Sequence, residues 1–253
     1  MTSTALPAPD PSAHRRMRGV PDSYAELSDY YDLLMTSGYY DYDTYAQALL
    51  SRIGMHRDVL ELGVGTGLVA DRLLARGPKD LRLTGIDHTD SMLAQARDRL
   101  GERVRLSRED VLDLSLPSAF DVAYSIGGVW NIVQDGEKSW LSSHLMEEED
   151  NEAALANLAA AIRPSGSLLL SVQGPHRRSD RTLPGDLAYT QHVEVDPEGR
   201  HTKDYFIEGQ GMVLAHQRLR FRLFPQETAD RLLQHCGFRF QESDDLLWHY
   251  VRR

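Results

Sequence analysis

The feature that most constrains the fold of this chain is an apolar run that leads into three glycines. The run VLEL at residues 59–62 precedes Gly63, Gly65 and Gly67, and the helical pattern LVADRLLAR follows directly. Glycine is required where a backbone turns tightly and approaches a ligand with no side chain in the way. The segment therefore predicts a buried strand, a ligand-binding turn and a helix.

The chain repeats this alternation of short apolar runs and helical patterns. The predicted strands are DVLELG, LRLTGID, VRLSRED, FDVAYSIG and GSLLLSVQG, and a long helical stretch ending near Ile162 separates the last two. Strands that alternate with helices imply a parallel sheet joined by right-handed crossovers. With FRFQES and LLWHYVRR as closing strands, we expect an α/β fold: a Rossmann-like, doubly wound, mostly parallel sheet of seven strands.

The pattern changes after the fifth predicted strand. LAYTQHVEV, HTKDYFIE and MVLAHQRLRFRLF are separated by the turns DPEG and GQG instead of helices. They predict a three-stranded antiparallel insertion within residues 186–224, on the substrate side of the domain. Residues 128–150 are predicted to form a second, lid-like insertion.

The remaining boundaries follow from composition. Residues 1–22 are rich in Pro, Ser and Ala and have no apolar periodicity, which predicts a mobile arm. Residues 23–253 are predicted to form one domain, in which residues 23–54 carry two helices that lie over the active site.

Overall composition and charge limit the classes of function. The chain is 41% hydrophobic and 26% charged, it lacks a signal-peptide core, and no run approaches the roughly 20 apolar residues of a membrane span. We therefore expect a cytoplasmic protein that does not bind membranes. A net charge of -10 also disfavours nucleic acid, because phosphate backbones are bound by clustered Lys and Arg.

Three acids mark the ends of the first three predicted strands. Glu61 precedes the glycine loop, Asp87 ends LRLTGID, and Asp110 follows VRLSRE. At the carboxyl edge of a parallel sheet, Asp87 can accept hydrogen bonds from two ribose hydroxyls. The alternative is that Asp87 caps the next helix, but Thr89 and Asp90 already offer such a cap. For Asp110 the alternative is an acidic surface turn.

The glycine loop also departs from a nicotinamide-dinucleotide fingerprint. That fingerprint reads G-x-G-x-x-G, whereas the sixth position here is Leu68 and an acid, Glu61, precedes the first glycine by two residues. An NAD-dependent oxidoreductase is therefore a disfavoured alternative.

The order of these motifs resembles a known family. With ELGVGTG, GIDHTDSMLAQAR, REDVLDL, FDVAYSIGG and RPSGSLLLSV in sequence, residues 55–175 are similar to class I S-adenosylmethionine-dependent methyltransferases. The resemblance implies that Asp110 accepts from the adenine amine, the Val111 amide reads the ring and His88 lies against the adenine face. The cofactor-binding residues that we expect are Glu61, Gly63, Gly65, Gly67, Asp87, His88, Asp110, Val111 and Ser125.

The outer parts of the chain are similar to a narrower group, the small-molecule N-methyltransferases that include dimethyltransferases of nucleotide-linked amino sugars. The similar features are YYDLL at residues 30–34, SIGG at residues 125–128 and the insertion leading into FRLFPQETADRLLQHCGF. The segment between SIGG and RPSG is longer than in that group.

The fold implied by the resemblance places the acceptor pocket over the same crevice. The predicted lining residues are Tyr31, Trp130, Asn131, Trp140 and His176. Tyr31 matches the tyrosine that closes the site in the resembling group, and the alternative for it and for both tryptophans is core packing. Arg220 lies on the polar face of an alternating strand, where it either binds a carboxylate or phosphate or is simply solvated.

The sequence thus predicts methyl transfer from S-adenosylmethionine to a nitrogen or oxygen of a small metabolite, in specialised biosynthesis, by a monomer or homodimer. The sulfonium is already an activated donor, so a base is required only for a hydroxyl or phenol acceptor. His176 is the first candidate base, His144 the second, and Tyr31 a third catalytic candidate. No metal is expected, because no cluster has metal-ligand spacing. The other alternative is a cofactor-binding scaffold or regulatory module that does not methylate.

Overall fold

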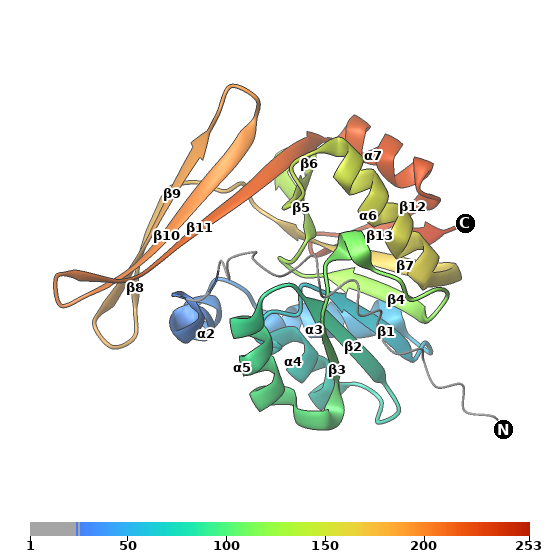
Figure 1. Cartoon of the computed structure of the whole chain (residues 1–253), viewed down its shortest axis with the longest axis horizontal. Coiled ribbons are helices and arrows are strands. Elements are labelled where there is room, and N and C mark those ends of the chain that lie inside the picture. The colour runs from blue at the N-terminus through green and yellow to red at the C-terminus, as the bar shows by residue number, and fades with distance from the viewer. Residues whose placement is uncertain (1–23, 25) are drawn as a thin grey trace.

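A continuous sheet of thirteen strands organises the computed structural model, which describes residue 24 and residues 26–253 (Figure 1). Helices cover both faces of its parallel part, and a long antiparallel part extends away from it. The arm predicted at residues 1–22 lies outside the described residues. None of the helices between Ser28 and His235 has the length and apolar character that a membrane crossing requires.

The parallel part has the strand order β3-β2-β1-β4-β7. Its strands are β1 (Asp58–Leu62), β2 (Arg82–Asp87), β3 (Arg105–Arg108), β4 (Phe120–Ser125) and β7 (Ile162–Gln173). Strand β13 (Leu247–Arg252) runs antiparallel to β7, and β12 (Phe238–Ser243) pairs with β13. The predicted Rossmann-like, mostly parallel sheet is therefore confirmed, with these seven strands as its core.

Two hydrophobic cores lie on opposite faces of this sheet. Successive side chains of a strand alternate between faces, so Val59 packs beneath α3 (Tyr42–Ile53), α4 (Leu68–Arg76) and α5 (Asp90–Leu100), whereas Leu60 packs beneath α6 (Glu148–Ala161) and α7 (Gln226–His235). Burial on both faces explains why apolar residues on both faces of β1, Val59, Leu60 and Leu62, follow one another so closely. The one charged side chain buried within it, Glu61, is discussed below.

The prediction of one long helix ending near Ile162 is wrong for the first half of that segment. Residues 130–143 form a hairpin of β5 (Trp130–Asp135) and β6 (Lys138–Ser143), and only α6 is helical. The loop places Gly136 at φ 61° in the first of its two positions, which suits a tight hairpin turn. The segment predicted to be lid-like thus lies within the sheet, where β5 pairs with β7 and β6 pairs with β11.

The insertion after β7 has four strands instead of three. It comprises β8 (Ser179–Leu183), β9 (Leu187–Val195), β10 (Arg200–Gly209) and β11 (Met212–Pro225), paired in that order and all antiparallel. Strand β8 is an edge strand whose middle side chains are exposed, so it carries no apolar alternation by which the sequence could reveal it. A 3-10 turn (Gly101–Arg103) precedes β3 and another (Val111–Asp113) follows it.

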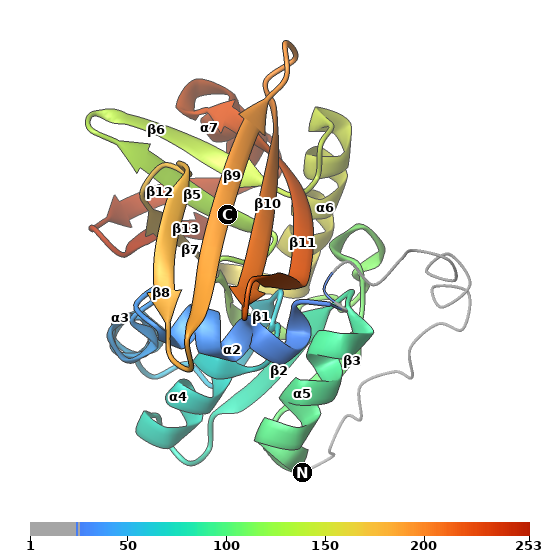
Figure 2. The ribbon, with the colours of Figure 1, turned by 90° about the vertical axis from the view of Figure 1, so that its left-hand side faces the viewer.

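Strands β8 to β11 stand over α2 (Ser28–Thr36), as Figure 2 shows. A third apolar cluster joins them: Leu27, Leu34 and Met35 contact Tyr205 and Ile207 of β10. Because α2 also lies near the carboxyl ends of β1 and β2, this packing closes a space between the insertion and the parallel sheet. That space is the candidate active site.

Candidate active site

The glycine loop between β1 and α4 has a backbone that other residues would strain. Gly63, Gly65 and Gly67 have φ values of 73°, 54° and 83°, in the left-handed region. A Cβ on Gly63 would lie 2.9 Å from the Cα of Gly128, in the loop after β4. The two loops therefore touch backbone to backbone, and this contact shapes one wall of the site.

A cleft of about 450 Å³, here called the cofactor cleft, opens at the carboxyl ends of β1, β2 and β3. Six of the predicted cofactor residues line it: Gly63, Gly65, Asp87, His88, Asp110 and Val111. Met92 of α5, the loop at residues 127–129, His144 and Arg220 complete its walls. The structure thus gathers residues from three strand ends at one edge, as an open α/β sheet is expected to do.

Asp87 connects the glycine loop to the start of α5. Its Oδ2 accepts a hydrogen bond from the Gly65 amide at 2.9 Å, and its Oδ1 accepts from the Thr89 amide at 2.9 Å. Each carboxylate oxygen has a second lone pair, so both remain able to accept from a ribose. The expectation that Thr89 and Asp90 cap α5 is wrong: the Thr89 hydroxyl makes no cap bond, and Asp90 pairs with Arg108.

The other predicted cofactor residues, Glu61, Gly67 and Ser125, do not line the cleft, so their roles stay predictions. The Glu61 carboxyl is only 2% exposed and accepts a hydrogen bond from the Tyr124 hydroxyl at 2.8 Å. Burial raises the pKa of Glu61 to about 8, and the nearby charge of Asp87 adds to this effect. The hydrogen bond from Tyr124 acts in the opposite direction but is the smaller effect.

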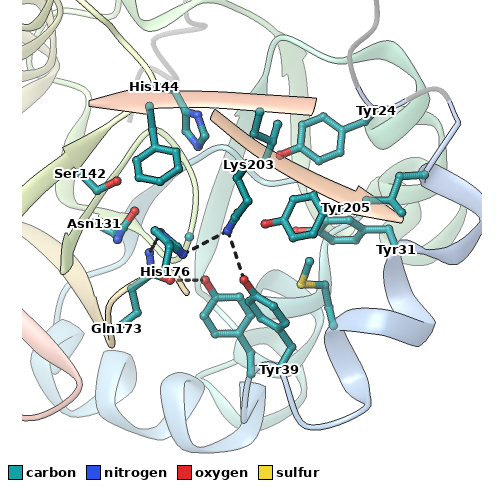
Figure 3. Close-up of a pocket in the computed structure, with 16 residues that line it drawn as sticks. Tyr24, Tyr31, Tyr39, Asn131, Ser142, His144, Gln173, His176, Lys203 and Tyr205 are labelled. Atoms are coloured by element: carbon teal, nitrogen blue, oxygen red, sulfur yellow. Dashed lines mark hydrogen bonds between the residues drawn. The ribbon is translucent and has the colours of Figure 1, made fainter. Parts of the chain in front are cut away.

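A second, smaller cavity of about 40 Å³, here called the inner chamber, adjoins the cofactor cleft (Figure 3). Its walls come from α2 and the segment after it, β5, β6, the end of β7, and strands β10 and β11. The two cavities share five lining residues: Tyr24, Tyr31, Gly127, His144 and Leu219. A molecule in the chamber would therefore lie directly beside one in the cleft.

A chain of polar contacts crosses the inner chamber. The Tyr40 hydroxyl donates to Gln173 Oε1 at 3.0 Å, and Gln173 Nε2 lies 3.2 Å from His176 Nε2. His176 Nδ1 lies 3.2 Å from Lys203 Nζ, which also donates to the Tyr39 hydroxyl at 3.3 Å. Figure 3 shows the Lys203 side chain reaching into the chamber between His176 and Tyr39.

This chain of contacts does not favour His176 as the base. Burial and then the neighbouring Lys203 ammonium lower the pKa of His176 to about 3, so its ring stays neutral. Both ring nitrogens already face protein groups, which leaves no free lone pair for an acceptor's proton. The structure thus places His176 in the predicted pocket. Its contacts there suit a residue that helps to bind a ligand better than one that takes a proton.

His144, the second candidate base, has one ring nitrogen, Nε2, without a hydrogen-bond partner in the part of the chain that the structure describes. Its Nδ1 lies 3.0 Å from the Arg220 carbonyl oxygen, which can only accept, so Nδ1 carries the hydrogen and Nε2 is unprotonated. Its ring borders both cavities, and the surrounding protein atoms lower its pKa below the ordinary value. A neutral imidazole with one open nitrogen can take a proton from a bound acceptor.

The predicted substrate residues divide into two groups. Tyr31 and Asn131 line the inner chamber, whereas Trp130 and Trp140 line neither cavity. Trp130 is fully buried and donates from Nε1 to Asn151 Oδ1 at 2.8 Å, so it is a core anchor. Trp140, the third residue of β6, pairs with Pro225 of β11, so its substrate role stays a prediction.

Several chamber residues escaped the sequence analysis, above all Lys203, Tyr39 and Gln173. Lys203 had a detectable signal: in β10 it shares the inward face with Tyr205 and Ile207, at the spacing of two that a strand requires. A lysine at one of the inward-facing positions of an alternating strand indicates a buried amine.

The glycine loop and the acids on successive strand ends lie within the part of this chain that matches a known protein family. Residues 59–166 match the family model described as a methyltransferase domain, so the chain carries such a domain over this range. Glycine/sarcosine N-methyltransferase of Parasynechococcus marenigrum (strain WH8102) is 31% identical over 159 residues, covering 56% of this chain and 49% of that enzyme. The chain thus spans about half the length of this curated relative.

Two solved structures have the same architecture. DesVI of Streptomyces venezuelae superimposes with a TM-score of 0.69 at 20% identity, over 90% of this chain and 99% of that one. CalS10 of Micromonospora echinaspora, an amino pentose methyltransferase whose structure holds S-adenosylmethionine, superimposes with a TM-score of 0.64 at 18% identity, over all of both chains. These likenesses establish the fold.

Proposed function

We propose that this protein transfers the methyl group of S-adenosylmethionine to a nitrogen or oxygen of a small molecule held in the inner chamber. The observation that carries the proposal is the shared wall of the two cavities, since a donor in the cleft and an acceptor in the chamber would meet beside Gly127 and Tyr31. Holding two reactants in contact is the main requirement when the donor is already activated.

The cofactor cleft fits S-adenosylmethionine in its polar groups. Asp87 would accept from the ribose hydroxyls with the lone pairs that its two amide partners leave open. Asp110 would accept from the adenine amine with the Val111 amide beside it, and His88 would lie against the ring, since all three line the cleft. When bound, the cofactor supplies the reactive methyl group.

For a hydroxyl or phenol acceptor we propose His144 as the general base. Its Nδ1 is held by the Arg220 carbonyl and its ring lines the chamber, and a base in reach of the acceptor typically contributes about 10²- to 10⁴-fold to the rate. His144→Asn should therefore lower kcat for an oxygen acceptor by roughly that factor, with little change in KM. For a nitrogen acceptor the same variant should change kcat far less, and the comparison of both acceptor types is the measurement.

A role in specialised biosynthesis is part of the proposal. It is supported by the full-length structural likeness to CalS10, which is described as acting in calicheamicin biosynthesis. The acid-rich chain and the enclosed chamber also suit a small metabolite better than a nucleic acid.

Two experiments test the proposal in sequence. Calorimetry with S-adenosylhomocysteine should show one binding site, whereas NADH should not bind. Incubation with isotopically labelled S-adenosylmethionine and a panel of amines, phenols and carboxylic acids should then yield a labelled product in the mass spectrum. Absence of S-adenosylhomocysteine binding would overturn the proposal. Binding without transfer to any panel member would favour the non-methylating scaffold instead.

A further inference from the structure

Lys203 is a buried amine that faces the inner chamber, and no Asp or Glu of residue 24 or residues 26–253 forms an ion pair with it. Lys203 is only 3% exposed, and the two side chains within hydrogen-bond distance of its Nζ, Tyr39 and His176, are both uncharged. The rings of Tyr205 and Phe221 lie 4.7 Å and 6.0 Å from its Nζ. Aromatic faces stabilise a cation only partly, and an isolated buried charge is costly. Within the described part of the chain, the ammonium therefore lacks the anion that a buried charge normally has.

The nearest acid along the strand cannot supply that anion. Asp204 follows Lys203 directly, so its side chain points to the opposite face of β10. There its carboxylate accepts from Arg218 Nε at 2.9 Å and lies 2.6 Å from His216 Nε2. Among the described residues that line the inner chamber, none is Asp or Glu.

A second unpaired donor faces the same chamber. Asn131, on β5, is 4% exposed, and its Nδ2 has no hydrogen-bond partner in the part of the chain that the structure describes. A buried amide donor without an acceptor costs free energy unless a ligand satisfies it. The Lys203 ammonium has three hydrogens, of which Tyr39 and His176 account for two. Figure 3 shows both side chains directed toward the chamber interior.

We infer that Lys203 and Asn131 form a carboxylate-binding subsite for the methyl acceptor. One carboxylate oxygen accepts from the free hydrogen of Lys203 and the other accepts from Asn131 Nδ2, so that both orphan donors and the buried charge are satisfied together. This assignment rests on the proposed function, because it takes the chamber as the acceptor site. It specifies an acceptor that bears a carboxylate besides its nucleophilic nitrogen or oxygen.

The size and position of the chamber support this assignment. A cavity of about 40 Å³ suits a small planar head group, while the rest of the acceptor would extend past the shared wall toward the cofactor cleft. Burial lowers the pKa of Lys203, and an incoming carboxylate would oppose that effect by favouring the ammonium. Neither Lys203 nor Asn131 lines the cofactor cleft, which separates this subsite from the cofactor's own carboxylate.

The test uses acetate and acetamide, which have nearly the same shape and differ in charge. Titrations of the full-length protein, with and without S-adenosylhomocysteine and followed by NMR, should show acetate binding at least about tenfold more tightly than acetamide. Lys203→Met should remove roughly tenfold to hundredfold of acetate affinity and leave acetamide affinity unchanged. Lys203→Arg should retain most of the preference, and Lys79→Met, at an exposed loop position, is the matched control.

Three results would overturn the assignment. Equal binding of acetate and acetamide by the wild-type protein would do so without any variant, so a folding defect cannot mask the answer. A loss of S-adenosylhomocysteine affinity in Lys203→Met equal to the loss of acetate affinity would assign the amine to the cofactor's carboxylate instead. Tighter binding of inorganic phosphate than of acetate would assign the subsite to a larger oxyanion. Because acetate binding is also measured without cofactor, a protein that fails to bind S-adenosylhomocysteine refutes the proposed function separately.

Discussion

Replacement of Asp87 by Asn tests the link between the glycine loop and cofactor binding. The wild-type carboxylate accepts from the amides of Gly65 and Thr89, each at 2.9 Å. Asn has the same shape but only one acceptor oxygen, so one of the two amides would face an N–H group. The variant therefore disturbs the loop and removes a charged ribose acceptor at the same time.

The expected magnitudes follow from these contacts. A buried amide left without its acceptor costs about 1 to 3 kcal/mol of unfolding free energy. Loss of hydrogen bonds from ribose hydroxyls to a charged acceptor costs about 1.5 to 3 kcal/mol of binding free energy, or roughly tenfold to hundredfold in Kd for S-adenosylhomocysteine. Both effects should be present in Asp87→Asn, and the larger should be on binding.

Calorimetry and thermal unfolding measure the two quantities separately. Asp98→Asn is the matched control, since Asp98 is exposed on the same helix that follows Asp87 and lines neither cavity. It should leave both the Kd and the melting temperature near the wild-type values. A Kd for Asp87→Asn within twofold of wild type would refute the ribose role, whatever the change in stability.

Two further predictions concern the buried parts of the same site. Gly128→Ala should strongly destabilise the fold, because the added Cβ would lie well inside 3.0 Å of the Leu62 carbonyl oxygen; Gly174→Ala, which has open space around it, should be tolerated in the same melting experiment. Glu61, with its pKa raised from 4.5 to about 8, keeps a proton in the folded state that the unfolded state releases. Its contribution to stability is therefore fully present below pH 4.5 and lost as pH rises to about 8. Glu61→Gln cannot lose that contribution, so between pH 4.5 and about 8 its melting temperature should rise relative to that of the wild type. Parallel plots of melting temperature against pH for the two proteins would contradict this prediction.

The tertiary contacts also favour His144 over His176 as the proposed base. On sequence, His176 was favoured because it directly follows a strand at the functional edge. In the structure, the Lys203 ammonium and Gln173 lie against its two ring nitrogens, whereas His144 keeps one nitrogen open. The difference arises from β10, which is far along the chain from either histidine.

The sequence by itself determined the parallel sheet, the glycine loop and the positions of Asp87 and Asp110. These features depend on local signals: apolar runs of strand length, glycines at fixed spacing and acids at strand ends. It also contained a signal for the hairpin of residues 130–143, the Asp135–Gly136 turn, which the helical prediction overlooked.

Only the tertiary structure decided what the inner chamber contains. Its polar groups come from α2, β5, β7 and β10, which are brought together by the pairing of β11 with β6 and by the packing of α2 beneath the insertion. No local pattern records that Lys203 would lie beside His176 and share a cavity with Asn131. Strand register and helix packing are set by the burial of many side chains at once, and these long-range contacts place a buried amine beside the proposed methyl-transfer site.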